Sequence, residues 1–367
     1  MNKLPDFLEG AVDLHVHSAP DIDPRRFNDI ELAREAARAR MSAILIKSHQ
    51  NSTVERAWLV SQWIPEIRVF GGIVLNETVG GLNPAAVSLA VKMGAKQVWM
   101  PTRSARNHRR YEGRSGGISV LGEDGRLLPA AEEILRILVG SGCILGTGHL
   151  NQEESFALIA RAGELGGVNV LVTHPEWAPT FYSVEQQKTL AASGIVNFER
   201  CFVSTTHLCG FVPFETIERA IMECGVETTV LSTDLGQPDT PPPVAGMRQY
   251  AERLRSSGFT VDDVRQMMQA NPIRLLNQGK TGKKSSTILT DDQTRHLSVA
   301  DVLRMGRRRV EAPNEGPPKS YRYLSLTLPC RGPPSWRPVG EPPGKSAATS
   351  TLCGFRDGVN SPANRRN

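Results

Sequence analysis

Short apolar runs rich in β-branched residues recur eight times along the first 277 residues. Each has the length and composition of a buried β-strand. The sequence predicts strands at Ala11–Val16, Ala43–Ile46, Val69–Leu75, Gln97–Met100, Cys143–Gly146, Val168–Val172, Ile195–Phe198 and Thr228–Leu231. Because the runs are nearly continuous in apolar residues, we expect a parallel sheet that is buried on both faces.

Amphipathic stretches fill the intervals between these runs. The predicted helices are Asn28–Arg40, Val54–Ile64, Pro84–Met93, Ala130–Val139, Glu153–Leu165, Val184–Ala192 and Phe214–Cys224, and after the last strand Val244–Arg255 and Val261–Gln269. Proline near helix starts, as at Pro84 and Pro129, and glycine directly after helices, as at Gly94 and Gly166, support these bounds.

Eight successive units of strand and helix predict an α/β protein with a closed (β/α)8 barrel, the TIM-barrel fold. The competing fold, an open doubly wound sheet, usually carries a glycine-rich phosphate loop after its first strand. Here that place reads His-Val-His-Ser-Ala-Pro, from His15 to Pro20. The sequence therefore favours the barrel.

The alternation of strands and helices ends after Asn277. Residues 278–367 hold 10 prolines and 16 lysines and arginines against 7 acidic residues, a net charge of +9, whereas residues 1–277 hold 27 against 31, a net charge of −4. The sequence predicts a barrel domain over 1–277 and a disordered, low-complexity Pro/Arg-rich tail over 278–367, with one short helix at Ser298–Arg307.

Composition narrows the class of protein. No apolar run is long enough to span a bilayer, and the first ten residues lack a signal-peptide core, so we expect a cytoplasmic protein that binds no membrane. The six cysteines are scattered without a CxxC pair, which argues against a zinc finger or a disulfide framework. The expected partner is a small-molecule substrate, without specific nucleic-acid binding, and a homo-oligomer is left open.

Candidate chemistry gathers at the ends of the predicted strands, where (β/α)8 barrels carry their active sites. Five of the eight histidines lie there: His15, His17, His49, His149 and His174. His15 and His17 share one strand face, because side chains alternate along a strand. Carboxylates follow other strands at Glu77, Glu199 and Asp234. Imidazoles and carboxylates that converge on one mouth suit a divalent metal.

This series resembles the amidohydrolase superfamily of metal-dependent hydrolases over about residues 10–277. The resemblance rests on His-Val-His at the first strand, His149 at the fifth, His174 at the sixth and Asp234 at the eighth. Within the superfamily, the chain looks like poorly characterised amidohydrolase-related cytosolic members. That impression comes from the segments Gly71–Glu77, Gly80–Pro84 and Val98–Thr102.

The resemblance implies roles for the strand-end residues. His15 and His17 are expected to bind the more buried metal, and His149 and His174 a second metal or the same site. Asp234 is expected to contact the metal and, as the catalytic residue, to take a proton from bound water. Zinc is the default metal for such ligands, as one or two ions, although manganese, iron and nickel also accept them.

Three further residues leave the number of metal ions open. Two-metal members with a bridging modified lysine carry it on the fourth strand, where this sequence has none. Lys47 and His49, after the second strand, have the parity to face the mouth, and Glu77 can supply a carboxylate ligand. We therefore add Lys47, His49 and Glu77 as candidate ligands, while an ordinary ion pair is the simpler expectation for Lys47.

The leading hypothesis is a hydrolase that cleaves an amide, ester or lactone-type bond in a small molecule. One alternative is a phosphoesterase of the polymerase-and-histidinol-phosphatase type, which shares the first motif but is expected to end its metal set with Asp-x-His. This chain reads Thr-Asp-Leu-Gly from Thr233 to Gly236. The same residues are also compatible with a metal-dependent decarboxylase and with a metal-binding barrel without turnover.

A basic segment, Arg103–Arg110, follows the fourth strand of an otherwise acidic domain. Arg103, Arg106 and His108 are candidate substrate-binding residues, because guanidinium groups at a barrel mouth can hold a carboxylate or phosphate; a solvated loop is the simpler explanation. The candidate pocket-lining aromatic residues are Trp99, Trp177, Phe181 and Tyr182, of which Trp99 is better explained as core. His207 is a weaker candidate.

Overall fold

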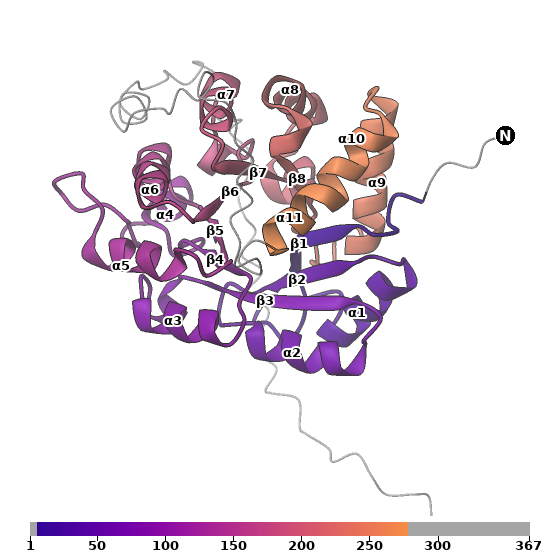
Figure 1. Ribbon diagram of the computed structural model, residues 1–367, viewed down its shortest axis with the longest axis horizontal. Coiled ribbons are helices and arrows are strands. Elements are labelled where there is room, and N and C mark those ends of the chain that lie inside the picture. Colours follow the sequence, from indigo (N-terminus) through magenta and orange to yellow (C-terminus); the bar gives the residue numbers. More distant parts are fainter. Residues whose placement is uncertain (1–5, 278–367) are drawn as a thin grey trace, which may run out of the picture. The chain divides into compact units, whose positions relative to one another are not determined.

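The computed structural model describes residues 6–277, which form eight parallel strands surrounded by helices (Figure 1). Each strand pairs with the next one along the chain, in the order β1 to β8. The strands are β1 (Val12–His17), β2 (Ala43–Lys47), β3 (Arg68–Val74), β4 (Gln97–Trp99), β5 (Ile144–Gly146), β6 (Asn169–Thr173), β7 (Val196–Cys201) and β8 (Thr229–Ser232). All eight predicted strands are present, and the predicted (β/α)8 barrel is confirmed.

The barrel closes just beyond the last strand. The backbone N–H of Asp234 donates to the carbonyl of His15 at 2.7 Å, and that of His17 donates to the carbonyl of Leu235 at 2.8 Å. The chain leaving β8 is thereby paired with β1. This pairing places Asp234 beside the two histidines of the first strand.

The helices that follow the strands lie around the barrel (Figure 1). They are α1 (Asp29–Arg38), α2 (Val54–Trp63), α3 (Pro84–Lys92), α4 (Arg106–Tyr111), α5 (Pro129–Leu138), α6 (Gln152–Leu165), α7 (Val184–Ala191), α8 (Phe214–Cys224), α9 (Pro243–Ser256), α10 (Val261–Arg265) and α11 (Asn271–Asn277). Asn28, Asn151, Ser183 and Thr260 begin their helices with capping boxes, which satisfy backbone N–H groups that have no partner within the helix.

The structure corrects two predicted regions, one expected as a loop and one expected as an uninterrupted helix. The basic segment after β4 was expected to be a loop, because its sequence lacks the apolar periodicity of a packed helix. In the structure, α4 forms within this segment. Asn107 holds α4 in place by donating from Nδ2 to the carbonyls of His149 and Pro179. The predicted helix Val261–Gln269 passes through a π-helical turn at Gln266–Ala270 before α11 begins.

Side chains fill the interior of the barrel, so it is a packed core and not a channel. Trp99 is fully buried there, and it fits because Gly72 and Gly146 carry no side chain: a Cβ atom would lie 2.7 Å and 2.5 Å, respectively, from its indole. Leu275 and Leu276 of α11 pack into the same cluster. The expectation that Trp99 belongs to the core is confirmed.

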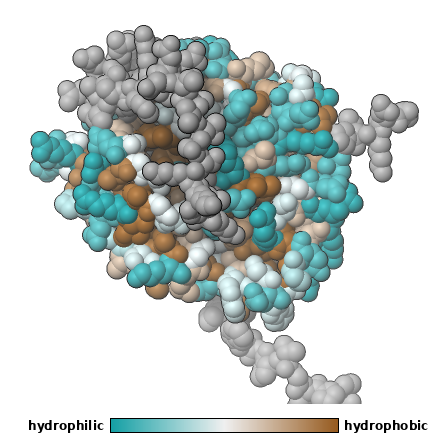
Figure 2. Space-filling view, viewed as in Figure 1, coloured by the Kyte–Doolittle hydropathy of each residue, from teal (hydrophilic) through white to brown (hydrophobic). Residues whose placement is uncertain are grey.

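The outer surface combines polar and apolar residues. Figure 2 shows hydrophilic residues around the periphery of one face and hydrophobic residues between them, towards its centre. Among the helices of residues 6–277, none is long and apolar enough to cross a membrane. The predicted disordered tail and its short helix at Ser298–Arg307 lie outside the described residues.

Candidate metal centre

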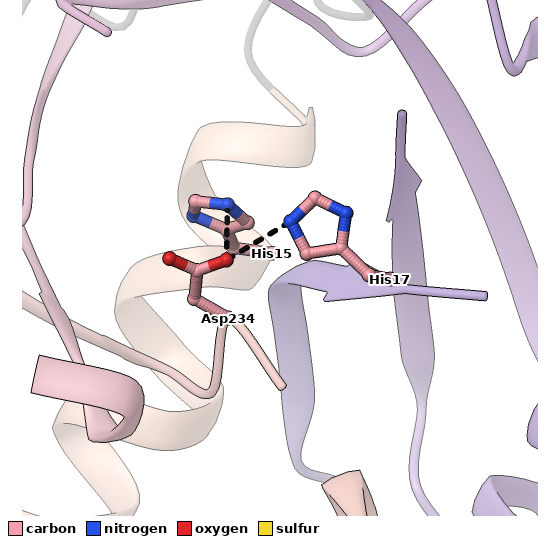
Figure 3. A group of neighbouring side chains, drawn as sticks. All are labelled: His15, His17 and Asp234. Atoms are coloured by element: carbon pink, nitrogen blue, oxygen red, sulfur yellow. Dashed lines mark hydrogen bonds and ion pairs between the residues drawn. The ribbon is translucent and has the colours of Figure 1, made fainter. Parts of the chain in front are cut away.

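Three side chains that the sequence singles out meet at the carboxyl end of the barrel (Figure 3). The Nε2 atoms of His15 and His17 each lie 3.0 Å from the same carboxylate oxygen of Asp234, Oδ1. Both imidazoles are fully buried, and the Asp234 side chain is 15% exposed. Two nitrogen donors and one oxygen donor therefore converge on one point, with geometry suited to a metal ion.

A β-bulge in β1 aims the two histidines at this point. The pairing with β2 shifts between Asp13 and Val16, so β1 contains one more residue than its partner over this stretch. Val12 and Leu14 pack inside the barrel, whereas Val16 packs in the outer core. If side chains alternated strictly after Leu14, which faces inward, His15 and His17 would face outward. The extra residue of the bulge reverses this, so that both histidines face inward.

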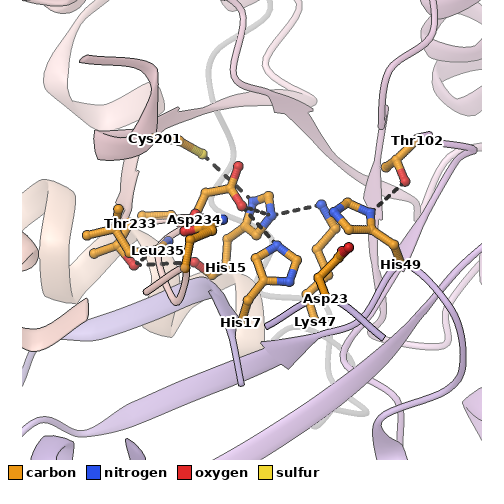
Figure 4. A network of polar contacts seen from close by, with 12 residues as sticks. His15, His17, Asp23, Lys47, His49, Thr102, Cys201, Thr233, Asp234 and Leu235 are labelled. Carbon is orange, nitrogen blue, oxygen red and sulfur yellow. Dashed lines mark hydrogen bonds and ion pairs between the residues drawn. The ribbon is translucent and has the colours of Figure 1, made fainter. Parts of the chain in front are cut away.

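Further polar groups surround His15 (Figure 4). Its Nδ1 lies 3.1 Å from Oε2 of Glu199, which is fully buried and also accepts a hydrogen bond from Ser232 Oγ at 3.1 Å. Lys47 Nζ lies 2.8 Å from His15 Nε2, and Cys201 Sγ lies 3.8 Å from Nδ1. Glu199 therefore holds the Nδ1 side of the ring, as a carboxylate often does for a metal-binding histidine, while Lys47 lies against Nε2.

The pKa values of the two histidines shift in opposite directions although they share one carboxylate. Burial opposes protonation of His15, but Asp234 and Glu199 outweigh it and raise its pKa. Burial, together with the nearby cation of Arg25, holds the pKa of His17 well below its usual range. Burial also opposes ionisation of Asp234, yet contacts with His15 and His17 hold its pKa well below the usual value. Asp234 is consequently a carboxylate at neutral pH.

Three more histidines, His49, His149 and His174, lie beside the group formed by His15, His17 and Asp234. The ring of His49 lies 5.0 Å from that of His17, and the rings of His149 and His174 lie 5.0 Å apart. Burial is the main cause that lowers the pKa of all three, in His174 to about 3. Neutral imidazoles keep a free lone pair, which is the form that binds metals.

Neighbouring residues orient these rings. His49 Nδ1 lies 2.9 Å from Thr102 Oγ1, and the Asn76 side chain bonds to that hydroxyl and to the His49 carbonyl. His149 Nδ1 lies 3.0 Å from His108 Nδ1. Within residues 6–277, the Nε2 atoms of His49, His149 and His174 make no hydrogen bond. These nitrogens are thus available to a ligand.

Backbone strain accompanies the site at two of its residues. His174 has φ of 30° and Asp234 has φ of 52°, in the left-handed region that residues with a Cβ atom rarely adopt. Such conformations cost roughly 1–3 kcal/mol each and occur preferentially at functional positions. They turn both side chains toward the mouth immediately after their strands end.

Comparison with protein-family models places the chain in a family. A family model described as a family of unknown function, DUF6282, matches residues 10–197, just over half of the 367-residue chain. The chain belongs to DUF6282. The matched region includes the five strand-end histidines and ends before Glu199 and Asp234. No curated protein matches the chain.

Solved structures share the fold of this DUF6282 chain at low sequence identity. An amidohydrolase from Pseudomonas aeruginosa aligns with a TM-score of 0.53 and 13% identity, over 75% of this chain and 97% of that one. A probable dipeptidase from the same organism, PvdM, gives 0.53 and 10% over 74% and 95%. A metallopeptidase named dipeptidase AC gives 0.50 and 12% over 74% and 99%. The predicted resemblance to amidohydrolases is thereby confirmed at the level of the fold.

Several site residues predicted from the sequence do not join the cluster of histidines in this DUF6282 chain. Glu77 is 54% exposed and pairs with Arg109 at 2.5 Å, because Asn76 takes the inward position that follows β3. Arg103 pairs with Asp23 at 2.6 Å. Arg106 is exposed, and its side chain makes no hydrogen bond in the described part of the chain.

The remaining candidates divide between the site and its surroundings. His108 is buried against His149, and the ring of Trp177 lies 5.0 Å from those of His149 and His174. Tyr182 packs beneath the surface on Phe156, Phe181 is 44% exposed, and the exposed His207 pairs with Asp239. We expected an ordinary ion pair for Lys47, but within residues 6–277 it forms none and instead contacts the imidazole of His15.

In the structure, Glu199 contacts a candidate metal ligand, His15, whereas the sequence marks it only as one of several carboxylates at strand ends. Its position at the end of a strand is visible in the sequence. Because side chains alternate along a strand, Glu199 faces the opposite side from its buried neighbour Phe198, and this alternation is the signal that points it inward.

Replacing Glu199 with Gln keeps the shape of the side chain but removes the negative charge beside His15. We expect zinc affinity to fall 10- to 100-fold, roughly the cost of losing an outer partner of a metal ligand. Competition with a chromogenic chelator measures this change, and an unchanged affinity would contradict the assigned role.

Proposed function

We propose that this protein is a metal-dependent hydrolase that cleaves an amide, ester or lactone-type bond in a small molecule. The observation that carries the proposal is the convergence of His15 Nε2 and His17 Nε2 on one oxygen of Asp234. Three donor atoms of the types that zinc accepts meet at the mouth of a barrel, where the catalytic groups of this fold lie.

The residues present fit a bound divalent ion. His15, His17 and Asp234 would hold it, with His49, His149 and His174 available beside them. The Nδ1 atom of His17 is buried and has no hydrogen-bond partner in the described residues, so Nε2 is the nitrogen with a defined contact. Lys47 would have to leave Nε2 of His15 for that nitrogen to bind metal. When bound, the metal lowers the pKa of water and polarises the bond to be cleaved.

The protein's own groups supply the proton transfers. The low pKa of Asp234 keeps it ionised, and within residues 6–277 its Oδ2 atom makes no hydrogen bond, so this oxygen can accept a proton from water and return it to the leaving group. Trp177 packs against His149 and His174 and shields that side of the site from solvent. An amidohydrolase and two dipeptidases share the fold, which supports amide bonds as the first class to test.

Metal content tests the first half of this proposal. Full-length protein purified without chelators and then given zinc or manganese should hold at least one equivalent. The His17→Ala variant should bind more than about 100-fold more weakly, since it loses a direct ligand and not only an outer partner. His207→Ala, which removes an exposed histidine outside the site, should bind as the wild type does. Less than about a tenth of an equivalent in the wild type would refute every metal-dependent activity.

Activity tests the second half. The metal-loaded protein should hydrolyse a member of an amide, ester and lactone panel. Asp234→Asn should lower kcat by about 10²–10⁴-fold, the usual contribution of a general acid–base group. A phosphoesterase activity that is indifferent to this substitution would favour that enzyme class instead.

A further inference from the structure

The geometry points to a carboxylate-binding subsite beside the candidate metal centre, in which Arg25 and Arg103 hold a carboxylate of the substrate and Asp23 occupies that place in its absence. This inference rests on the proposed function, because it assigns a substrate class to the same site. It adds Arg25 and Asp23, which sequence reasoning did not select, and it separates Arg103 from the rest of the basic segment.

The segment that carries Arg25 is fixed at the mouth of the barrel. It follows β1 directly, and Arg26 fastens it to the loop after β8: its backbone N–H donates to the Gly236 carbonyl and its Nη2 to that of Thr240, both at 2.8 Å. That loop begins with Asp234. Segment and metal centre therefore lie at the same end of the barrel.

Arg25 is held in one orientation. Its Nε and Nη2 donate to Oδ2 of Asp21 at 3.2 Å and 3.0 Å, and its side chain is only 1% exposed. A buried guanidinium that is already paired on one edge keeps its other edge aimed in a constant direction. Little side-chain entropy then remains to be lost when a ligand binds.

Asp23 connects this guanidinium to a second one. Its Oδ2 lies 2.6 Å from Arg103 Nη1 and 3.6 Å from Arg25 Nη2, so one carboxylate oxygen sits between cations carried by the loops after β1 and β4. Figure 4 draws Asp23 together with the polar groups around His15 and His17. A carboxylate thus already occupies the position that we assign to the substrate.

Both cations stand on segments that also carry groups of the metal centre. Arg25 follows His17 in the segment after β1, and Arg103 is next to Thr102, whose Oγ1 lies 2.9 Å from His49 Nδ1. A carboxylate bound between the two arginines would therefore lie at the same mouth as the histidine cluster.

The arrangement leaves donors for a ligand. In residues 6–277, Arg25 Nη1 and the Nε and Nη2 atoms of Arg103 make no hydrogen bond. Asp23 is 32% exposed, and its neighbour Ile22 is 76% exposed, so no packing contact of that neighbour fixes the carboxylate in place. When Asp23 moves aside, Asp21 still neutralises Arg25, and one net positive charge is free to bind one substrate carboxylate.

Titration with malonate, followed by calorimetry, tests the subsite in full-length protein. Arg103→Met should weaken malonate binding at least tenfold, because it removes charge-assisted hydrogen bonds. Asp23→Asn should strengthen it several-fold by removing the internal competitor. Arg110→Met, an exposed arginine of the same segment, is the matched control and should leave binding unchanged.

Each outcome decides the proposal. Equal malonate affinity in Arg103→Met and wild type, or no gain in Asp23→Asn, would overturn it, and tighter binding of inorganic phosphate than of malonate would overturn the choice of carboxylate. The titrations are run on metal-free and zinc-loaded protein. Arginine-dependent binding that persists without metal supports the subsite even if the protein takes up no zinc, which separates this inference from the proposed function.

Discussion

Acidification should unfold the metal-free protein steeply between about pH 6.5 and pH 4. His17, His49, His149 and His174 are buried, and burial is the main cause that lowers their pKa values below the ordinary 6.5. Below pH 6.5 these groups take up protons in the unfolded chain but not in the folded one. The free energy of unfolding therefore falls as the pH falls.

The slope of this loss can be estimated. Each proton bound only by the unfolded chain changes the free energy of unfolding by about 1.4 kcal/mol per pH unit, so four such groups give a slope of roughly 5 kcal/mol per pH unit. Two buried carboxyl groups oppose part of this effect. Burial raises the pKa of Asp13 to about 6 and also raises that of Glu176, so in the folded protein both bind a proton at a higher pH than they do in the unfolded chain. The four histidines outnumber them, and the net loss exceeds an ordinary domain's stability of about 5–15 kcal/mol within a few pH units.

Urea unfolding of chelator-treated protein at a series of pH values measures this slope. The His49→Gln variant, which removes one titrating group, should reduce the slope by about 1.4 kcal/mol per pH unit. A free energy of unfolding that stays flat between pH 7 and pH 5 would show that the buried histidines gain protons as readily in the folded protein as in the unfolded chain.

Replacing Arg200 with Met should destabilise the fold by about 3–5 kcal/mol, the usual cost of leaving a buried charge without its partner. Arg200 lies on β7 next to Glu199 but points to the outside of the barrel, where it is fully buried against Glu176 and Gln187. Burial already raises the pKa of Glu176, and Arg200 is the main group that counters this effect. Without the guanidinium, the buried carboxylate must take up a proton or draw in water.

Denaturant unfolding at pH 7 measures this loss. The double variant Arg200→Met with Glu176→Gln should recover most of it, because no unpaired charge then remains and the volume is nearly kept. A loss below about 1 kcal/mol in the single variant would show that solvent reaches Glu176 in the folded protein. Glu199 directly precedes Arg200 on β7. Zinc affinity measured on both variants therefore also shows whether the pair of Arg200 and Glu176 positions the carboxylate of Glu199.

The barrel was predictable because its signals are local and repeated. Each strand is an apolar run closed by a turn, and a run such as Ala43–Ile46 is apolar on both faces only because helices cover one side and the packed interior fills the other. Trp99 could be assigned to the core for the same reason. By contrast, α4 depends on Asn107 reaching the carbonyls of distant residues, which no local pattern encodes.

The site was predictable by residue type and less so by contact. The positions of His15, His17 and Asp234 follow from strand ends, but their convergence needs the bulge in β1 and the positive φ of Asp234. Glu77 lies outside the histidine cluster because one residue decides which way a side chain faces, and the inward place belongs to Asn76. The contact between Lys47 and His15 joins two strands at a register that the sequence does not specify.

The closure of the barrel links its integrity to its chemistry. The backbone groups of His15, His17 and Asp234 tie the end of the last strand to the first, and their side chains meet at the same place. His17 and Asp234 are separated by 217 positions along the chain. An ion held between them would act as a reversible cross-link between the first strand and the end of the last, and because the site forms only in the folded chain, its binding free energy would stabilise the closed barrel. Hydrogen exchange at the amides of His17 and Asp234 would then report occupancy of the site and opening of the seam in one measurement.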